Sequence, residues 1–76
     1  MASGRLYAYT GAALLQMAAA EAADLIQAHY LAHLALRVLH AQGRLQGRKD
    51  PSTEHLREAL RLSRGLIGLD RGRTTA

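Results

Sequence analysis

Three histidines in the middle of the chain come closest to a chemical motif. His29 and His33 are four residues apart in the segment His-Tyr-Leu-Ala-His, a spacing that places two imidazoles on one face of a helix and can bring both to one metal ion. The segment lacks the glutamate that supplies the general base in the His-Glu-x-x-His helix of metalloproteases. His40 lies seven residues beyond His33, about 10 Å further along a helix axis, which is too far to share that ion.

A metal site on this segment would need a third ligand from another chain. We therefore predict no metal and no cofactor, and keep His29 and His33 only as weak metal candidates. The competing interpretation is a stripe of histidines that faces solvent or an interface. Because histidine is the side chain that changes charge nearest to neutral pH, such a stripe would make an interface sensitive to pH.

Residues for covalent or acid–base catalysis are scarce. The chain has no cysteine, no paired carboxylates around a pocket-forming segment and no glycine-rich phosphate loop after a strand. Ser52 is placed to cap a helix, and Ser63 falls on an apolar stripe where its hydroxyl would bond to its own helix. We predict that the protein is not an enzyme and assign no catalytic residue.

Positive charge is concentrated in the second half of the chain. Residues 1–36 have a net charge of −1, whereas residues 37–76 have a net charge of +5. A basic half of this kind is typical of proteins with acidic partners, and it predicts nucleic acid as the alternative partner, contacted at its phosphates. The candidate contacts are Arg44, Arg48, Lys49, Arg57, Arg61 and Arg64. No aromatic residue follows Tyr30, so bases would find no stacking partner there, and a solvated arginine face is the competing interpretation.

Residues 11–42 are predicted to form one long α-helix. The segment is dominated by alanine and leucine, contains no proline and has its only glycine at its first position. Its second half is apolar on one side only, opposite the histidines. Its first half is apolar nearly all the way round, interrupted only by Gln16, Glu21 and Asp24. A helix of that kind is normally buried, so the first half needs a cover.

A second helix is predicted over about residues 51–69. Gly43 suits the position that ends the long helix, and residues 43–50 form the loop. The preferred start has Asp50 as N-cap and Pro51 at the first helical position, with Ser52 as the competing N-cap.

The two ends of the chain are less regular. Ser3 and Thr10 are both suitable N-caps, so residues 1–10 are either an N-terminal arm or the start of the long helix. Residues 70–76 are predicted to be a mobile basic tail.

Helix lengths decide the predicted architecture. The two helices would be about 48 Å and about 27 Å long, so a hairpin leaves the first half of the long helix bare. The predicted fold class is therefore all-α, an antiparallel helical hairpin that completes a four-helix bundle by oligomerisation. The predicted protein interface is formed by Leu14, Leu15, Ala18, Ala22, Leu25 and Ile26.

The architecture leads to a functional prediction. We expect a non-enzymatic interaction module, either self-associating or a subunit or adaptor of a larger complex. Its partner would be a second copy or another helical protein. The chain has no uninterrupted apolar run of about 18 residues, so we expect a cytoplasmic protein and no membrane partner.

Overall fold

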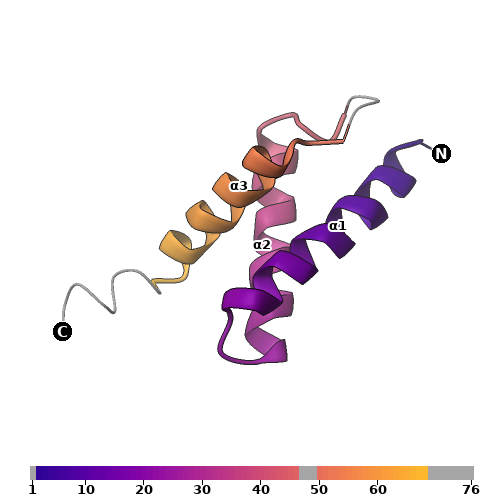
Figure 1. Ribbon diagram of the computed structural model, residues 1–76. Helices are drawn as coiled ribbons and strands as arrows, with labels where there is room; N and C mark the ends of the chain where they lie inside the picture. Colours follow the sequence, from indigo (N-terminus) through magenta and orange to yellow (C-terminus); the bar gives the residue numbers. More distant parts are fainter. Residues whose placement is uncertain (1, 47–49, 69–76) are drawn as a thin grey trace.

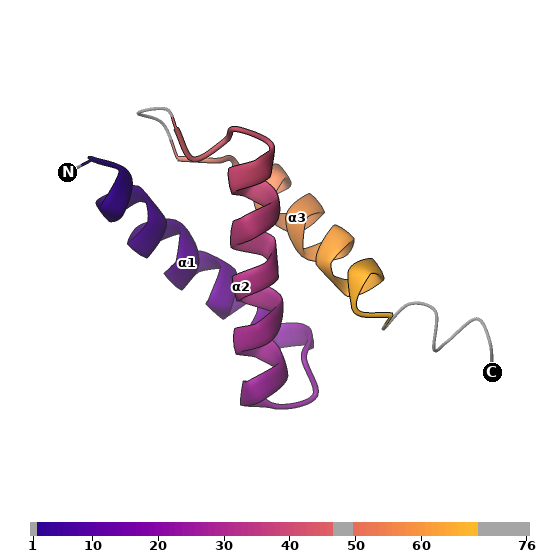
Figure 2. The same ribbon diagram turned by 180° about the vertical axis from the view of Figure 1, so that it is seen from behind.

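The computed structural model describes residues 2–46 and 50–68, with side chains from Ala8 onward. This part of the chain forms three helices and no strand (Figure 1): α1 is Ala2–Glu21, α2 is Leu25–Ala41 and α3 is Thr53–Leu66. α2 packs against both other helices, whereas α1 and α3 contact each other little. Figure 2 shows α2 in front of α1 and α3, which both lie on its other side. The all-α class is confirmed, but the described residues form three helices where a hairpin of two was predicted.

The prediction of one helix over residues 11–42 is wrong, because the chain turns between Glu21 and Leu25. Asp24 has an extended backbone, and its carboxylate accepts a hydrogen bond from the N–H of Gln27 at 2.8 Å. The side-chain oxygen of Gln27 accepts from the N–H of Ala23, also at 2.8 Å. The first bond satisfies a donor that the start of a helix leaves without a partner, and the second ties the turn to the first turn of α2. The apolar first half can therefore fold back and pack on the second.

α1 passes through Thr10 and Gly11 without a break. A Cβ atom added to Gly11 would lie 3.8 Å from Cδ1 of Leu36, an ordinary van der Waals distance. Gly11 therefore lies on the side of α1 that faces α2. Packing on α2 offsets the low helix propensity of this glycine.

Gly43 ends α2, as predicted. Its φ of 76° lies in the left-handed region, which a residue without a Cβ atom adopts most easily. The N–H of Gly43 donates to the carbonyl of His40, and the N–H of Arg44 donates to the carbonyl of Leu39, both at 3.0 Å. This pair of bonds is the Schellman motif, and it satisfies carbonyls at the end of the helix.

α3 begins with Ser52 as its N-cap, so the preference for Asp50 and Pro51 is wrong. The Ser52 hydroxyl accepts from the N–H of His55 at 3.2 Å, and Nδ1 of His55 lies 3.4 Å from the N–H of Ser52. A capping serine thus gains a reciprocal contact from the third helical residue. The helix ends at Leu66. The predicted basic tail lies outside the described residues.

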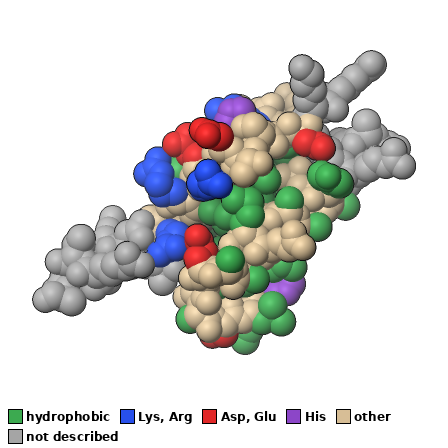
Figure 3. Space-filling model, in the orientation of Figure 1, with side chains coloured by type: hydrophobic (Ala, Val, Ile, Leu, Met, Phe, Trp, Pro, Cys, Tyr) green, Lys and Arg blue, Asp and Glu red, His purple; other side chains and the backbone are tan. Residues whose placement is uncertain are grey.

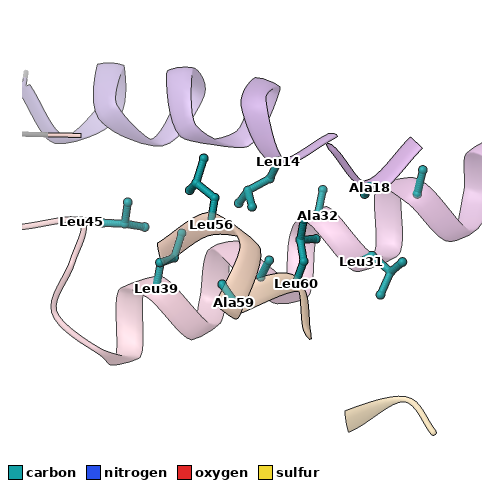
Figure 4. Close-up of a cluster of buried hydrophobic side chains, with 11 residues drawn as sticks. Leu14, Ala18, Leu31, Ala32, Leu39, Leu45, Leu56, Ala59 and Leu60 are labelled. Atoms are coloured by element: carbon teal, nitrogen blue, oxygen red, sulfur yellow. The ribbon is translucent and has the colours of Figure 1, made fainter. Parts of the chain in front are cut away.

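The core is built from leucine and alanine side chains of all three helices and from Leu45 in the loop after α2 (Figure 4). Its buried members are Leu14, Ala18, Ala28, Leu31, Ala32, Ala35, Leu39, Leu45, Leu56, Ala59 and Leu60. In the described part of the chain, two buried polar residues accompany them. The Ser63 hydroxyl donates to the carbonyl of Ala59 at 2.8 Å, as predicted for a core serine on its own helix. Oγ1 of Thr10 has no hydrogen-bond partner in the described part of the chain.

Candidate functional site

The predicted protein interface is divided by the fold. Leu14 and Ala18 are completely buried in the chain's own core, so neither is on the surface for a partner to contact. The reason is the turn before Leu25, which allows α2 to pack against the apolar side of α1. These two positions must be removed from the predicted interface.

The other four predicted interface residues remain at least partly accessible. Leu15 and Ala22 are partly buried and pack against the core. Leu25 and Ile26, the first two residues of α2, are 65% and 82% exposed. The fold therefore places the six residues in three environments rather than along one continuous seam.

A different face of α1 is exposed, and we call it the α1 outer face. It consists of Ala8, Tyr9, Ala12, Gln16 and Ala19. At about 100° per residue these positions fall in one arc of the helix, opposite the buried residues Thr10, Leu14 and Ala18. A shallow hollow in this face is lined by Tyr9, Ala12, Ala13, Leu15, Gln16 and Ala19.

Between Ala8 and Ala19, where the side chains are described, the α1 outer face contains no charged residue. Tyr9 is 65% exposed, and Gln16 is its only other residue with a polar side chain. A helix face in water normally carries charged side chains, because they are well hydrated and also favour the helix. Alanine and tyrosine instead give an apolar surface that a second helix can approach closely.

The histidines lie on the outside of α2. His29, His33, Arg37 and His40 are all exposed, as the helical spacing predicted. Among the described residues, no three side chains of histidine, aspartate or glutamate lie close enough to hold a metal ion. His29 and His33 thus stand on an open surface without a third ligand from the described part of their own chain.

The candidate nucleic-acid contacts do not form one bare basic patch in the described part of the chain. Arg61 pairs with Glu58, and Arg64 pairs with Glu21, each at 3.1 Å. Nη1 of Arg44 lies 2.9 Å from Nε2 of His55. Arg57 is exposed on α3. Arg48 and Lys49 lie outside the described residues, so binding of nucleic acid stays a prediction.

The α1 outer face was missed because Ala12 and Ala19 look the same in sequence as the buried Ala18. Only the packing of Leu14 and Ala18 against the rest of the core decides which side of an almost uniformly apolar helix is covered. A signal was nevertheless available: Asp24 and Gln27 are spaced as a helix-capping pair. If that pair had been interpreted as the start of a helix, the sequence would have predicted two helices over residues 11–42, with the first folded back on the second.

Comparison with known proteins gives no relative. No protein-family model matches the chain, and no curated protein or solved structure has a significant match to it. The class is therefore defined by the structure alone: an all-α chain whose described part has three helices. None of the described helices is both long enough and apolar enough to cross a bilayer.

Proposed function

We propose that this protein is a helical interaction module that pairs with a second copy of itself through the α1 outer face. The observation that carries the proposal is the uncharged, alanine-rich arc of Ala8, Tyr9, Ala12, Gln16 and Ala19. Removing apolar surface from water is worth about 25 cal/mol per Å², so an arc of this kind gains from being covered.

Charge favours a second copy as the occupant. A face without charges can meet itself across a two-fold axis without repulsion between like groups. The second half of the chain is less suited to self-pairing, because residues 37–76 carry a net charge of +5. Copies that met through Arg57 and Arg61 on α3 would bring arginines together.

The sizes of the side chains favour an antiparallel pair. Tyr9 lies near one end of the α1 outer face and Ala19 near the other, about 15 Å apart along the axis. In an antiparallel pair, Tyr9 of each copy would lie over the Ala19 region of the other copy, where small side chains leave room.

One pair of helices is a small interface compared with about 800 Å² per partner in a standard complex. We therefore expect a dimer that dissociates on dilution.

The proposal is tested by measuring the solution mass by light scattering over a range of protein concentrations, at low and high salt. The wild-type protein is expected to form a dimer at high concentration at both salt concentrations. Ala12→Lys and Ala19→Lys each place a charge in the pairing surface, so they should give a monomer. The matched control is Ala41→Lys, at the exposed end of α2, which should leave the dimer intact.

Two outcomes would contradict self-association. A wild-type protein that is monomeric at every concentration would mean that the α1 outer face belongs to a different helical partner. A dimer that survives both Ala12→Lys and Ala19→Lys would mean that the copies meet through another surface.

A further inference from the structure

We propose a second site, the α1–α3 groove, that binds a small soluble anion with an apolar tail. The groove is lined by Met17, Ala20, Glu21, Arg57, Leu60, Arg61 and Arg64. It has a volume of about 530 Å³, within the range of about 300–1,000 Å³ that is usual for small-molecule sites. It is separate from the α1 outer face, so the site does not depend on the proposed self-association.

The floor of the groove is apolar. Leu60 is only 3% exposed, Met17 is partly buried, and Ala20 is exposed beside them on α1. Figure 3 shows hydrophobic side chains between α1 and α3, with Lys or Arg side chains on the α3 side. A short alkyl chain lying on this floor would be removed from water at the same time as the floor itself.

The rim of the groove is positive. Arg57 and Arg61 are four residues apart on α3 and therefore project from the same face of that helix. Among the charged residues that line the groove, three are arginines and one, Glu21, is acidic. The groove therefore attracts an anion, and guanidinium groups bind carboxylate and phosphate oxygens with two parallel hydrogen bonds.

The ion pairs already present leave room for such a ligand. Arg64 is held at 3.1 Å by Glu21, a contact that links α1 to α3 at one side of the groove. Arg61 pairs with Glu58, but the two side chains are 66% and 53% exposed. An exposed pair of this kind is worth little, so Arg61 can turn from Glu58 to an incoming acid group. Arg57 and Arg61 are therefore the residues that would hold the head group.

A small amphiphile fits the groove better than a polynucleotide does. The apolar floor of Met17, Ala20 and Leu60 matches an alkyl chain and offers nothing to a phosphate backbone. Aromatic side chains on which bases could stack do not line the groove. The same surface therefore selects for the combination of an acid group and an apolar tail.

The test compares three probes by titration calorimetry: octyl phosphate below its micelle concentration, inorganic phosphate and octyl glucoside. We expect octyl phosphate to bind more tightly than either of the others, because inorganic phosphate lacks the tail and octyl glucoside lacks the charge. The amide NMR signals of Ala20 and Leu60 should shift with octyl phosphate. Binding should weaken as salt increases.

Variants identify the residues responsible. Arg57→Gln and Arg61→Gln should each weaken octyl phosphate binding by about tenfold, the loss expected for one charge-assisted hydrogen bond. The matched control is Arg37→Gln, on the exposed side of α2, which should bind as the wild type does. Ala19→Lys should also retain binding, which separates this site from the proposed dimer.

Three results would overturn the proposal. Octyl phosphate could bind no more tightly than inorganic phosphate, which would remove the role of the apolar floor. Arg57→Gln and Arg61→Gln could bind it as well as Arg37→Gln does, which would place binding elsewhere. A short single-stranded oligonucleotide could bind more tightly than octyl phosphate and lose affinity in the same two variants, which would make α3 a nucleic-acid surface.

Discussion

Nη1 of Arg44 lies 2.9 Å from Nε2 of His55, and Nδ1 of the same ring lies 3.4 Å from the backbone nitrogen of Ser52. The guanidinium and the backbone amide are both donors, so each contact needs the ring nitrogen to accept. A neutral imidazole has one acceptor nitrogen, and a protonated imidazole has none. His55 can therefore satisfy only one of its two neighbours at a time at this connection between α2 and α3.

Replacement of His55 by glutamate should resolve this conflict. A carboxylate accepts at both oxygens, so it can take the N–H of Ser52 in a capping box and also pair with Arg44. It also places negative charge in the first turn of α3, where the helix dipole favours it. We expect His55→Glu to raise the free energy of unfolding by about 0.5–1.5 kcal/mol, measured by urea denaturation.

Thr53→Glu is the control for this substitution. Thr53 is the first residue of α3 and is exposed, so the new charge lies in the same turn but replaces no side chain of the cap. An equal gain from Thr53→Glu would show that the dipole alone is responsible and that the conflict at His55 costs nothing.

Thr10→Val should also stabilise the protein. Thr10 is 2% exposed, and its hydroxyl has no hydrogen-bond partner in the described part of the chain. Burial of such a hydroxyl costs about 1–3 kcal/mol, and valine has nearly the same shape without it. Thermal unfolding of Thr10→Val should therefore occur at a higher temperature than that of the wild type. The exposed Thr53→Val should show no such gain, and a lower melting temperature for Thr10→Val would mean that its hydroxyl is satisfied.

Local signals in the sequence predicted the helix ends unevenly. Gly43 was predicted correctly because a glycine after a helical segment has a specific role at positive φ. The pair Asp24 and Gln27 has an equally specific role, but strong helix propensity on both sides favoured a continuous helix. The turn forms because these side chains bond to the backbone and because folding back buries Leu14 against the rest of the core.

The candidate sites were harder to predict than the helices. The exposed positions of His29 and His33 follow from polar and apolar sides that are distinct in the sequence of α2. The sequence of α1 has no distinct polar and apolar sides, so a helical wheel could not show that Ala19 is exposed and Ala18 is buried. The α1–α3 groove brings Met17 close to Arg57, and contacts between residues that far apart depend on the packing of all three helices.

Two glycines should respond in opposite directions to alanine. Gly43 has a φ of 76°, a conformation in which a Cβ atom is strained, so Gly43→Ala should lower the free energy of unfolding by about 1 kcal/mol. Gly65 lies within α3, and an added Cβ atom would meet nothing within 4 Å. Gly65→Ala should therefore raise the free energy of unfolding by about 0.5–1 kcal/mol, because alanine favours the helix more than glycine does. Denaturant midpoints for the two variants measure both effects, and a higher midpoint for Gly43→Ala would contradict the assigned end of α2.

Neighbouring alanines on α1 provide the strictest test of how this helix is oriented. Ala18 is completely buried in the core, whereas Ala19 is exposed on the α1 outer face. A carboxylate at position 18 would be buried without a partner, at a cost of several kcal/mol. A chain of this size rarely has more than about 3–5 kcal/mol of stability, so Ala18→Glu should be largely unfolded by circular dichroism. Ala19→Glu should keep the wild-type helix content, because its carboxylate stays in water. The opposite result, a folded Ala18→Glu and an unfolded Ala19→Glu, would mean that α1 packs through the other side and that its outer face is not available to a second copy.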